Sequence, residues 1–76
     1  MANVILPELG EDIKKAVVSA WFVKVGDRVA QDDDIVELAT DKATFNVAAT
    51  TSGVIKKILI SEGQEAKIGQ PLAVIE

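Results

Sequence analysis

Cysteine and histidine are both absent from this chain of 76 residues. Without cysteine, no disulfide and no thiolate metal site supports the fold. Without histidine, the chain lacks the usual general base, the usual zinc ligand and the base of the common nucleophilic triads. We therefore expect no catalytic residue and no metal site among its side chains.

Positive charge and long apolar runs are also scarce. Eight basic residues stand against twelve acidic ones, which gives a net charge of −4 and a pI near 4.7. Nucleic-acid binding depends on clustered lysine and arginine, so nucleic acid is not an expected partner. No apolar run approaches the roughly 18 residues of a membrane span, and the amino end has no basic region typical of a signal peptide. We expect no membrane contact and a cytoplasmic location, or the mitochondrial matrix or a plastid in a eukaryote.

The residues that are present predict one small all-β domain covering residues 1–76. Hydrophobic residues make up 49% of the chain and charged residues 26%, a balance too apolar for disorder. Short runs rich in valine, isoleucine and threonine are interrupted by glycine or acidic clusters about every eight to twelve residues, as in all-β domains. The predicted strands are Asn3–Leu6, Ala16–Lys24, Ile35–Thr40, Ala43–Ala48, Val54–Ser61 and Leu72–Ile75.

The chain also contains an internal repeat. A shift of 37 residues places Gly26 on Gly63 and superposes apolar positions on both sides of the glycine. Two such units, each too small to bury its own face, are expected to pack about a pseudo-twofold axis. Because the repeat mate of Lys42 would lie beyond the last residue, we expect a hairpin at one pole and the two chain ends at the other. The superposed apolar pairs are Val18 and Ile55, Phe22 and Leu59, Val23 and Ile60, Val29 and Ala66, Ile35 and Leu72, and Leu38 and Ile75.

Two alternating runs meet at Asp41-Lys42, which we interpret as the two loop residues of a hairpin. This register places Leu38 opposite Phe45, and a slip by one residue would mix the apolar and polar faces. A tight type I′ turn requires positive φ at both loop residues, which suits Asp41 but not Lys42. A solubilising charge is the ordinary role of such a lysine. Here we interpret the lysine as one whose side chain is exposed at the hairpin tip so that another molecule can act on it.

The ordered set of motifs around this turn resembles a known family. "TDKA" lies between two short strands, after "WFVKVGDRVAQDDDIVEL" and before "GVIKKILISEGQEAKIGQPLAVIE". The set is similar to the lipoyl domain of 2-oxo acid dehydrogenase complexes, over essentially the whole chain. The resemblance implies an all-β fold, a flattened barrel of two four-stranded antiparallel sheets with pseudo-twofold symmetry, known as the barrel-sandwich hybrid.

The resemblance also implies a carrier function without catalysis. Lys42, flanked by Asp41 and Ala43, would carry lipoic acid through an amide. The arm would move acyl groups and reducing equivalents between a thiamine-diphosphate-dependent decarboxylase, an acyltransferase and dihydrolipoamide dehydrogenase. A lipoate ligase or lipoyltransferase would attach it. The domain is expected to be monomeric and to belong to an acyltransferase subunit, with a dehydrogenase or binding-protein subunit as alternatives. "DKA" followed by Thr44 favours a pyruvate complex.

Recognition by the decarboxylase is implied for a loop after the first strand, which contains Glu8, Glu11 and Asp12. The family often has an acidic residue three places before the lysine, where this chain has Ala39. Glu37 projects to the same side of the predicted strand and is a candidate substitute.

Two other functions remain open. Biotin carrier domains share this fold, but typically place methionines beside their lysine, and Met1 is the only methionine here. The second alternative is an unmodified β-barrel interaction module. Asp32, Asp33 and Asp34 lack the glycine and closing glutamate of a calcium loop, so a solvated turn is expected there. Trp21 is interpreted as padding of the barrel surface rather than a binding anchor.

Overall fold

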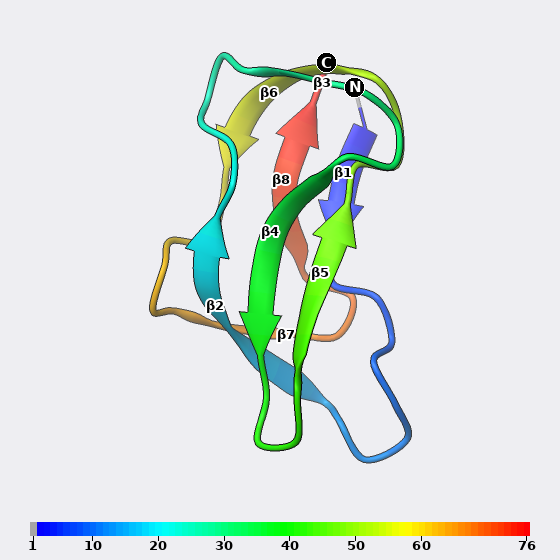
Figure 1. Cartoon of the computed structure of the whole chain (residues 1–76), viewed down its shortest axis with the longest axis vertical. Coiled ribbons are helices and arrows are strands. Elements are labelled where there is room, and N and C mark those ends of the chain that lie inside the picture. The colour runs from blue at the N-terminus through cyan, green and yellow to red at the C-terminus, as the bar shows by residue number, and fades with distance from the viewer. Residues whose placement is uncertain (1) are drawn as a thin grey trace.

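The protein is an antiparallel all-β domain of two four-stranded sheets, seen in a computed structural model that describes residues 2–76 (Figure 1). One sheet has the order β1-β8-β6-β3 and the other β5-β4-β2-β7. This confirms the fold class implied by the family resemblance. No residue from 2 to 76 lies in a helix, so that part of the chain contains no helix able to cross a membrane. The strands are β1 Ala2–Ile5, β2 Lys15–Trp21, β3 Arg28–Val29, β4 Asp34–Ala39, β5 Thr44–Ala48, β6 Gly53–Ile58, β7 Glu65–Lys67 and β8 Pro71–Ile75.

All six strands predicted from the alternating pattern are present, but two of them end early. β2 ends at Trp21 and β6 at Ile58, three residues before the predicted ends. Beyond Trp21 the chain leaves its sheet and crosses to the other. Phe22 N donates to Ile35 O at 2.9 Å on one side, and Gly26 N donates to Ile55 O at 2.8 Å on the other. The apolar alternation therefore continues past the end of β2, through residues 22–26, where the chain passes from one sheet to the other.

The pseudo-twofold repeat is confirmed in the hydrogen bonds that join the sheets. Gly26 N donates to Ile55 O at 2.8 Å, and its repeat mate Gly63 N donates to Val18 O at 2.8 Å. Both glycines have positive φ, 97° and 87°, a conformation that disfavours any residue with a Cβ atom. The two copies therefore cross at equivalent glycine turns.

The same symmetry extends to side chains that close the turns. Lys24 N donates to Asp27 Oδ2, and the repeat mate Ser61 N donates to Gln64 Oε1, both at 2.8 Å. A second pair of turns has the same arrangement. Ala30 N donates to Asp33 Oδ2 at 2.9 Å, and the repeat mate Lys67 N donates to Gln70 Oε1 at 3.0 Å. Asp33 is thus used within its own turn, which agrees with the expected solvated loop. Of residues 2–76, no three potential metal ligands gather in one place.

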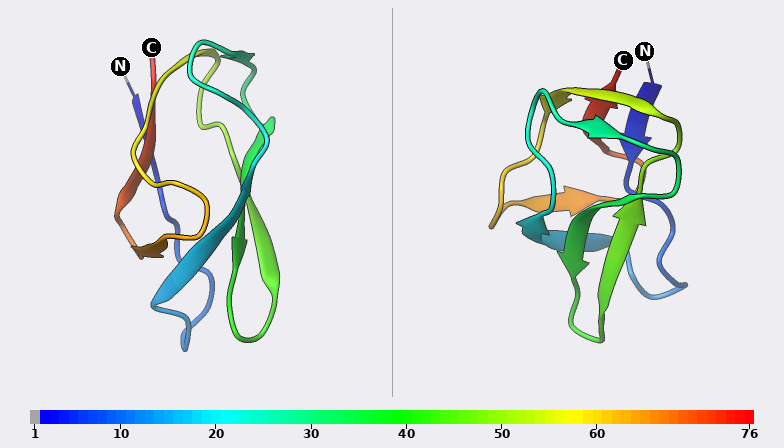
Figure 2. Two further views of the ribbon diagram at one scale, coloured as in Figure 1. Left: turned by 90° about the vertical axis from the view of Figure 1, so that its left-hand side faces the viewer. Right: turned by 45° about the horizontal axis from the view of Figure 1, so that its top comes forward.

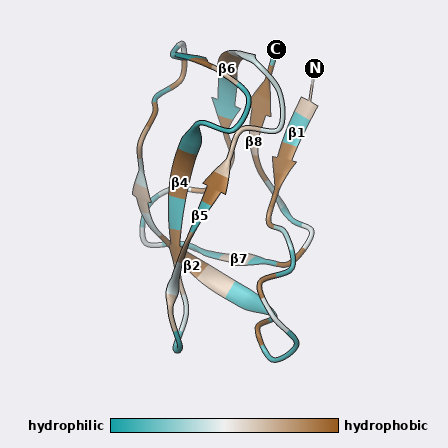
Figure 3. Cartoon of the chain, turned by 45° about the vertical axis from the view of Figure 1, so that its right-hand side comes forward, coloured by the Kyte–Doolittle hydropathy of each residue, from teal (hydrophilic) through white to brown (hydrophobic). Residues whose placement is uncertain are grey.

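The hydrophobic core lies between the two sheets. Figure 2 shows β1 and β8 in one layer and β4 and β5 in the other, and Figure 3 shows the alternating hydrophobic and hydrophilic bands along β4. Trp21 is half-buried against this core and its Nε1 donates to Ile60 O at 2.8 Å, whereas Phe22 is 52% exposed. The largest fully buried side chains are Leu6, Ile35, Leu38, Ile55, Leu72, Ile75, Val4, Val18 and Val36.

The two poles of the domain carry different parts of the chain, as the repeat predicts. The hairpin between β4 and β5 protrudes at one end of the long axis, which extends over 32 Å, and both chain ends lie at the other (Figure 1). Ala2 of β1 pairs with Ile75 of β8 at that second pole. The hairpin tip and the loop between β1 and β2 thus lie together at the pole opposite the chain ends (Figure 1).

Two glycine substitutions separate steric crowding from backbone strain. A Cβ atom on Gly53 would lie 2.6 Å from Glu76 O and 2.8 Å from Ile75 Cγ2, while one on Gly63 would contact nothing within 4 Å. Gly53→Ala is expected to lower the free energy of unfolding by about 3 kcal/mol through forced displacement of β8. Gly63→Ala should lower it by only about 1 kcal/mol, from positive φ alone. Urea unfolding of both variants tests this, and equal losses would contradict it.

Candidate functional site

The site is built on the hairpin between β4 and β5, whose predicted register is confirmed. Val36 pairs with Val47, Leu38 with Phe45 and Ala39 with Thr44. Val36, Leu38 and Val47 are buried, whereas Glu37 is half-buried and Asn46 exposed. The buried face fixes the register, because a slip by one residue would expose the valines and the leucine. That register places Asp41 and Lys42 at the tip.

The turn at the tip is not of type I′. Between residues 2 and 76, Asp32 is the only residue other than glycine with positive φ, so Asp41 and Lys42 both have negative φ. Lys42 therefore occupies the tip without backbone strain. An unfavourable turn conformation is therefore no reason to interpret Lys42 as displayed for its side chain. The exposure of its side chain at the tip of a protruding hairpin remains.

Thr40 provides the hydrogen bonds that shape the turn. Its Oγ1 accepts from Lys42 N at 3.3 Å and from Ala43 N at 3.1 Å, and donates to Ala43 O at 2.9 Å. The backbone N of Thr40 also donates to Ala43 O, at 2.9 Å. A threonine hydroxyl that accepts from amides two and three residues ahead is a recognised side-chain substitute for a backbone turn. The sequence reasoning overlooked this residue, although threonine just before a two-residue loop is a usable signal.

The side chain of Lys42 reaches a loop thirty positions earlier in the chain. Its Nζ lies 3.2 Å from Asp12 Oδ2, with 64% and 81% of the two side chains exposed. An ion pair this open to water adds little to stability. Its importance is spatial, because it shows that the loop between β1 and β2 lies beside the hairpin tip, as the resemblance implies.

An open groove of about 650 Å³ separates the hairpin from this loop and the start of β2. Its floor is apolar, formed in part by Ile13, Val17 and Ala39, and Val17 is 38% exposed. Lys42 and Asp12 stand on its rim. The groove leaves room beside the lysine for a covalently attached group. The complete lining consists of Asp12, Ile13, Lys14, Lys15, Ala16, Val17, Ala39, Thr40, Asp41, Lys42 and Glu65.

The structure brings some of the predicted site residues together and separates others. Asp12 and Asp41 share the groove with Lys42, and Ala43 adjoins it at the tip. Glu8 and Glu11 are exposed in the β1–β2 loop but do not line the groove, among the residues described.

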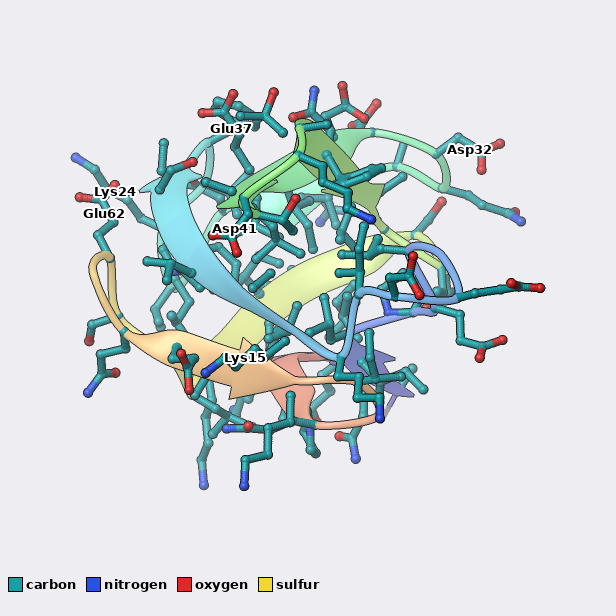
Figure 4. All side chains as sticks on the ribbon, turned by 90° about the horizontal axis from the view of Figure 1, so that it is seen from below. Lys15, Lys24, Asp32, Glu37, Asp41 and Glu62 are labelled. Carbon is teal, nitrogen blue, oxygen red and sulfur yellow. The ribbon has the colours of Figure 1, made fainter. Side chains whose placement is uncertain are left out.

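Glu37, the candidate substitute for an acid at position 39, does not line the groove. Its Oε2 accepts from Ser19 Oγ at 3.0 Å on the outer face of the sheet, and only Ala39 of the two lines the groove. Figure 4, which looks onto the hairpin end, shows Glu37 at the periphery and Asp41 nearer the centre. Ser19 and Val17, like Thr40, were not anticipated from the sequence, because their roles depend on how the strands pair.

The chemistry available at this site is that of one exposed primary amine. Its polar partner is the exposed carboxylate of Asp12, at 3.2 Å, and 64% of the lysine side chain is exposed. Such an amine, with open space next to it, fits a group attached through an amide. The arrangement suits display rather than catalysis.

Comparisons with known proteins agree with this geometry. A family model for biotin and lipoyl attachment, described as "biotin-requiring enzyme", matches residues 2–75. In Staphylococcus saprophyticus, the succinyltransferase component of the 2-oxoglutarate dehydrogenase complex is 39% identical over 75 residues, covering 99% of this chain and 18% of that protein. The bovine mitochondrial lipoamide acyltransferase of the branched-chain alpha-keto acid dehydrogenase complex is 41% identical over 71 residues. The match covers 93% of this chain and 15% of that protein.

Further relatives and two solved structures extend the comparison. The acetyltransferase component of the pyruvate dehydrogenase complex of Staphylococcus epidermidis is 32% identical over 71 residues, covering 93% of this chain and 16% of that protein. The lipoyl domain of the Azotobacter vinelandii 2-oxoglutarate dehydrogenase complex superposes with a TM-score of 0.78 at 32% identity, covering 97% and 94%. Kluyveromyces lactis urea carboxylase superposes with a TM-score of 0.67 at 28% sequence identity, and the match covers 99% of this chain and 7% of that protein.

The chain spans less than a fifth of the length of these curated relatives, and it matches the solved lipoyl domain almost end to end. The relatives are divided among three complexes that act on different 2-oxo acids, so they do not single out pyruvate. The hairpin with Lys42 at its tip thus lies on a fold that this chain shares with a solved lipoyl domain. The chain belongs to the biotin/lipoyl attachment family, and within it to the non-catalytic lipoyl domains of 2-oxo acid dehydrogenase complexes.

Proposed function

We propose that Lys42 is the attachment site for lipoic acid and that the domain carries the resulting arm between active sites. The observation that supports this most strongly is the position of Lys42. It is an exposed amine at the tip of the β4–β5 hairpin, at the pole opposite the chain ends. A carrier needs its reactive arm as far as possible from the point where the domain is tethered.

The attachment reaction forms one amide bond. A lipoate ligase first uses ATP to convert the lipoate carboxylate into an acyl adenylate, releasing pyrophosphate. The neutral Lys42 amine then attacks the acyl carbon, AMP leaves and the amine loses a proton. The cation of Lys42 becomes a neutral amide, so the net charge of the domain changes from −4 to −5.

The dithiolane of the bound lipoyl group supplies the redox and acyl-carrying chemistry, while the chain supplies position. The paired strands β4 and β5 place the tip at the end of the hairpin, and the groove next to Lys42 leaves open space for the first atoms of the arm. A tethered carrier meets each active site at an effective concentration of roughly millimolar for short flexible linkers, which replaces slow encounters in solution.

The proposed partners follow from the family resemblance, and the relatives, which are components of 2-oxo acid dehydrogenase complexes, support them. They are a thiamine-diphosphate-dependent 2-oxo acid decarboxylase, an acyltransferase catalytic domain and dihydrolipoamide dehydrogenase. An acyltransferase is the proposed parent subunit, and the domain acts as a monomer. Bacterial and mitochondrial relatives both occur, which supports the cytoplasm or the mitochondrial matrix as the location. The preference for pyruvate that "DKA" and Thr44 indicate stays a prediction.

Recognition by the decarboxylase is proposed to depend on the acidic rim of the groove. Asp12 and Asp41 lie beside Lys42, and Asp12 is 81% exposed. Glu8 and Glu11 extend the same negative loop away from the groove. Charges at the edge of a contact surface act mainly on the rate of encounter and on the choice of partner.

Biotin is the second candidate for the attached group, because the matching family model is described as a biotin-requiring enzyme. The neighbours of Lys42 argue against it. They are Asp41 and Ala43, where the biotin carriers that this fold resembles typically have methionines.

The first prediction concerns the modified residue. Incubation of the chain with lipoate, ATP and a lipoate ligase is expected to add one lipoyl group, detected as a single adduct by intact mass. Lys42→Arg should fold with unchanged thermal stability, because its ion pair with Asp12 is exposed, and should take no adduct. An adduct on Lys42→Arg would contradict the assignment, and an adduct formed only with biotin ligase would support the biotin alternative.

The second prediction concerns partner recognition. Asp12→Asn removes one rim charge without removing a buried contact, so lipoylated Asp12→Asn should lose about threefold or more in kcat/KM for reductive acylation by its cognate decarboxylase. Glu37→Gln, on the outer face, is the matched control and should behave as wild type. Pyruvate, 2-oxoglutarate and branched-chain decarboxylases are assayed in parallel. Equal losses in both variants would refute a special role for the groove rim.

A further inference from the structure

We propose that Thr40 is a positioning residue for the modification of Lys42. Its hydroxyl holds the hairpin tip in the shape that a lipoate ligase recognises. The inference rests on the proposed attachment of lipoate to Lys42 and adds to it a residue that determines how well the lysine is presented.

The hydroxyl of Thr40 spans the whole tip. It bonds the amide of Lys42 at 3.3 Å, the amide of Ala43 at 3.1 Å and the carbonyl of Ala43 at 2.9 Å. The backbone contributes one closing bond of its own, from Thr40 N to Ala43 O. One side-chain atom therefore fixes the two peptide units on either side of the lysine Cα atom and the one that follows Ala43.

Little else restrains this tip. Asp41, Lys42 and Ala43 are all exposed, so water competes for their backbone amides. The side-chain bonds within the tip, among residues 2–76, come from Thr40 and not from the Asp41 carboxylate. Without the hydroxyl, the amides of Lys42 and Ala43 would exchange their partner for water and the turn would sample other conformations.

In other turns of the domain, the side chain that accepts the hydrogen bond lies on the opposite side of the turn in sequence. In the turns at 24–27 and 61–64 the capping side chain, Asp27 or Gln64, follows the turn by accepting from a preceding amide. At the lysine hairpin the capping side chain precedes the turn. The side chains of Asp41, Lys42 and Ala43 are thereby left free of this structural task, as a surface read by another enzyme requires.

The rate of modification depends on the fraction of molecules whose hairpin tip has the conformation that the ligase accepts. The ligase must place the Lys42 amine at the acyl carbon of the lipoyl adenylate, whose amide product forms as AMP and a proton leave. Only tips with the lysine correctly directed are competent, and the apparent affinity falls in proportion to their fraction. Loss of the Thr40 bonds should therefore raise KM and leave kcat unchanged.

Three variants of the 76-residue chain test this. Thr40→Val removes the hydroxyl with little change in shape, and Thr40→Ser restores it. Thr44→Val is the matched control, because Thr44 is an exposed threonine of the same hairpin, paired with Ala39. Initial rates of lipoylation are followed by intact mass over a range of domain concentrations. Thr40→Val should show about a threefold or larger rise in KM with unchanged kcat. Thr40→Ser and Thr44→Val should match the wild type.

Amide hydrogen exchange on the unmodified variants provides a readout that does not depend on the ligase. Exchange at Lys42 and Ala43 should accelerate in Thr40→Val and not in Thr44→Val, while exchange in β2 and β8 stays unchanged. Thr40→Val lipoylated with wild-type KM, or Thr40→Ser as impaired as Thr40→Val, would overturn the inference. Failure of the proposed function is distinguishable, because no adduct would then form on the wild type itself.

Discussion

The pairing of β4 with β5 in a single register is the constraint on which the site depends. Side chains alternate between the faces of a strand, so a slip of one residue would bring Glu37 and Asn46 into the core and expose Leu38. The same slip would move Lys42 off the tip. Burial of a few apolar residues thus determines where the Lys42 amine protrudes. The packing of the core therefore sets the position of the functional lysine.

The rest of the domain supports this pole. Two copies of one strand–glycine–strand unit cross at Gly26 and Gly63 and close around a shared core. The chain ends are left together at the far pole, where Ala2 pairs with Ile75. A domain built this way can be tethered at one end and offer its arm at the other, which is the arrangement that a carrier visiting several active sites requires.

The sequence predicts those features that follow from periodicity. The register, the repeat and the position of the lysine all depend on which residues are apolar. β3 and β7, with two and three residues, are too short to show an alternating pattern. The shape of the turn was not predicted, because it involves hydrogen bonds from the Thr40 side chain. The pairing of Asp12 with Lys42 and the diversion of Glu37 to Ser19 depend on how distant segments meet, which local patterns do not encode.

The central claim is that this fold selects one lysine among seven for attachment of a lipoyl group. Tandem mass spectrometry of peptides from ligase-treated, folded protein tests it most directly. The account predicts a lipoyl adduct on Lys42 and on no other lysine, lost when the domain is unfolded before treatment. Adducts spread over Lys14, Lys56 and Lys67, or unchanged by unfolding, would contradict it, because the hairpin would then have no part in selecting the site.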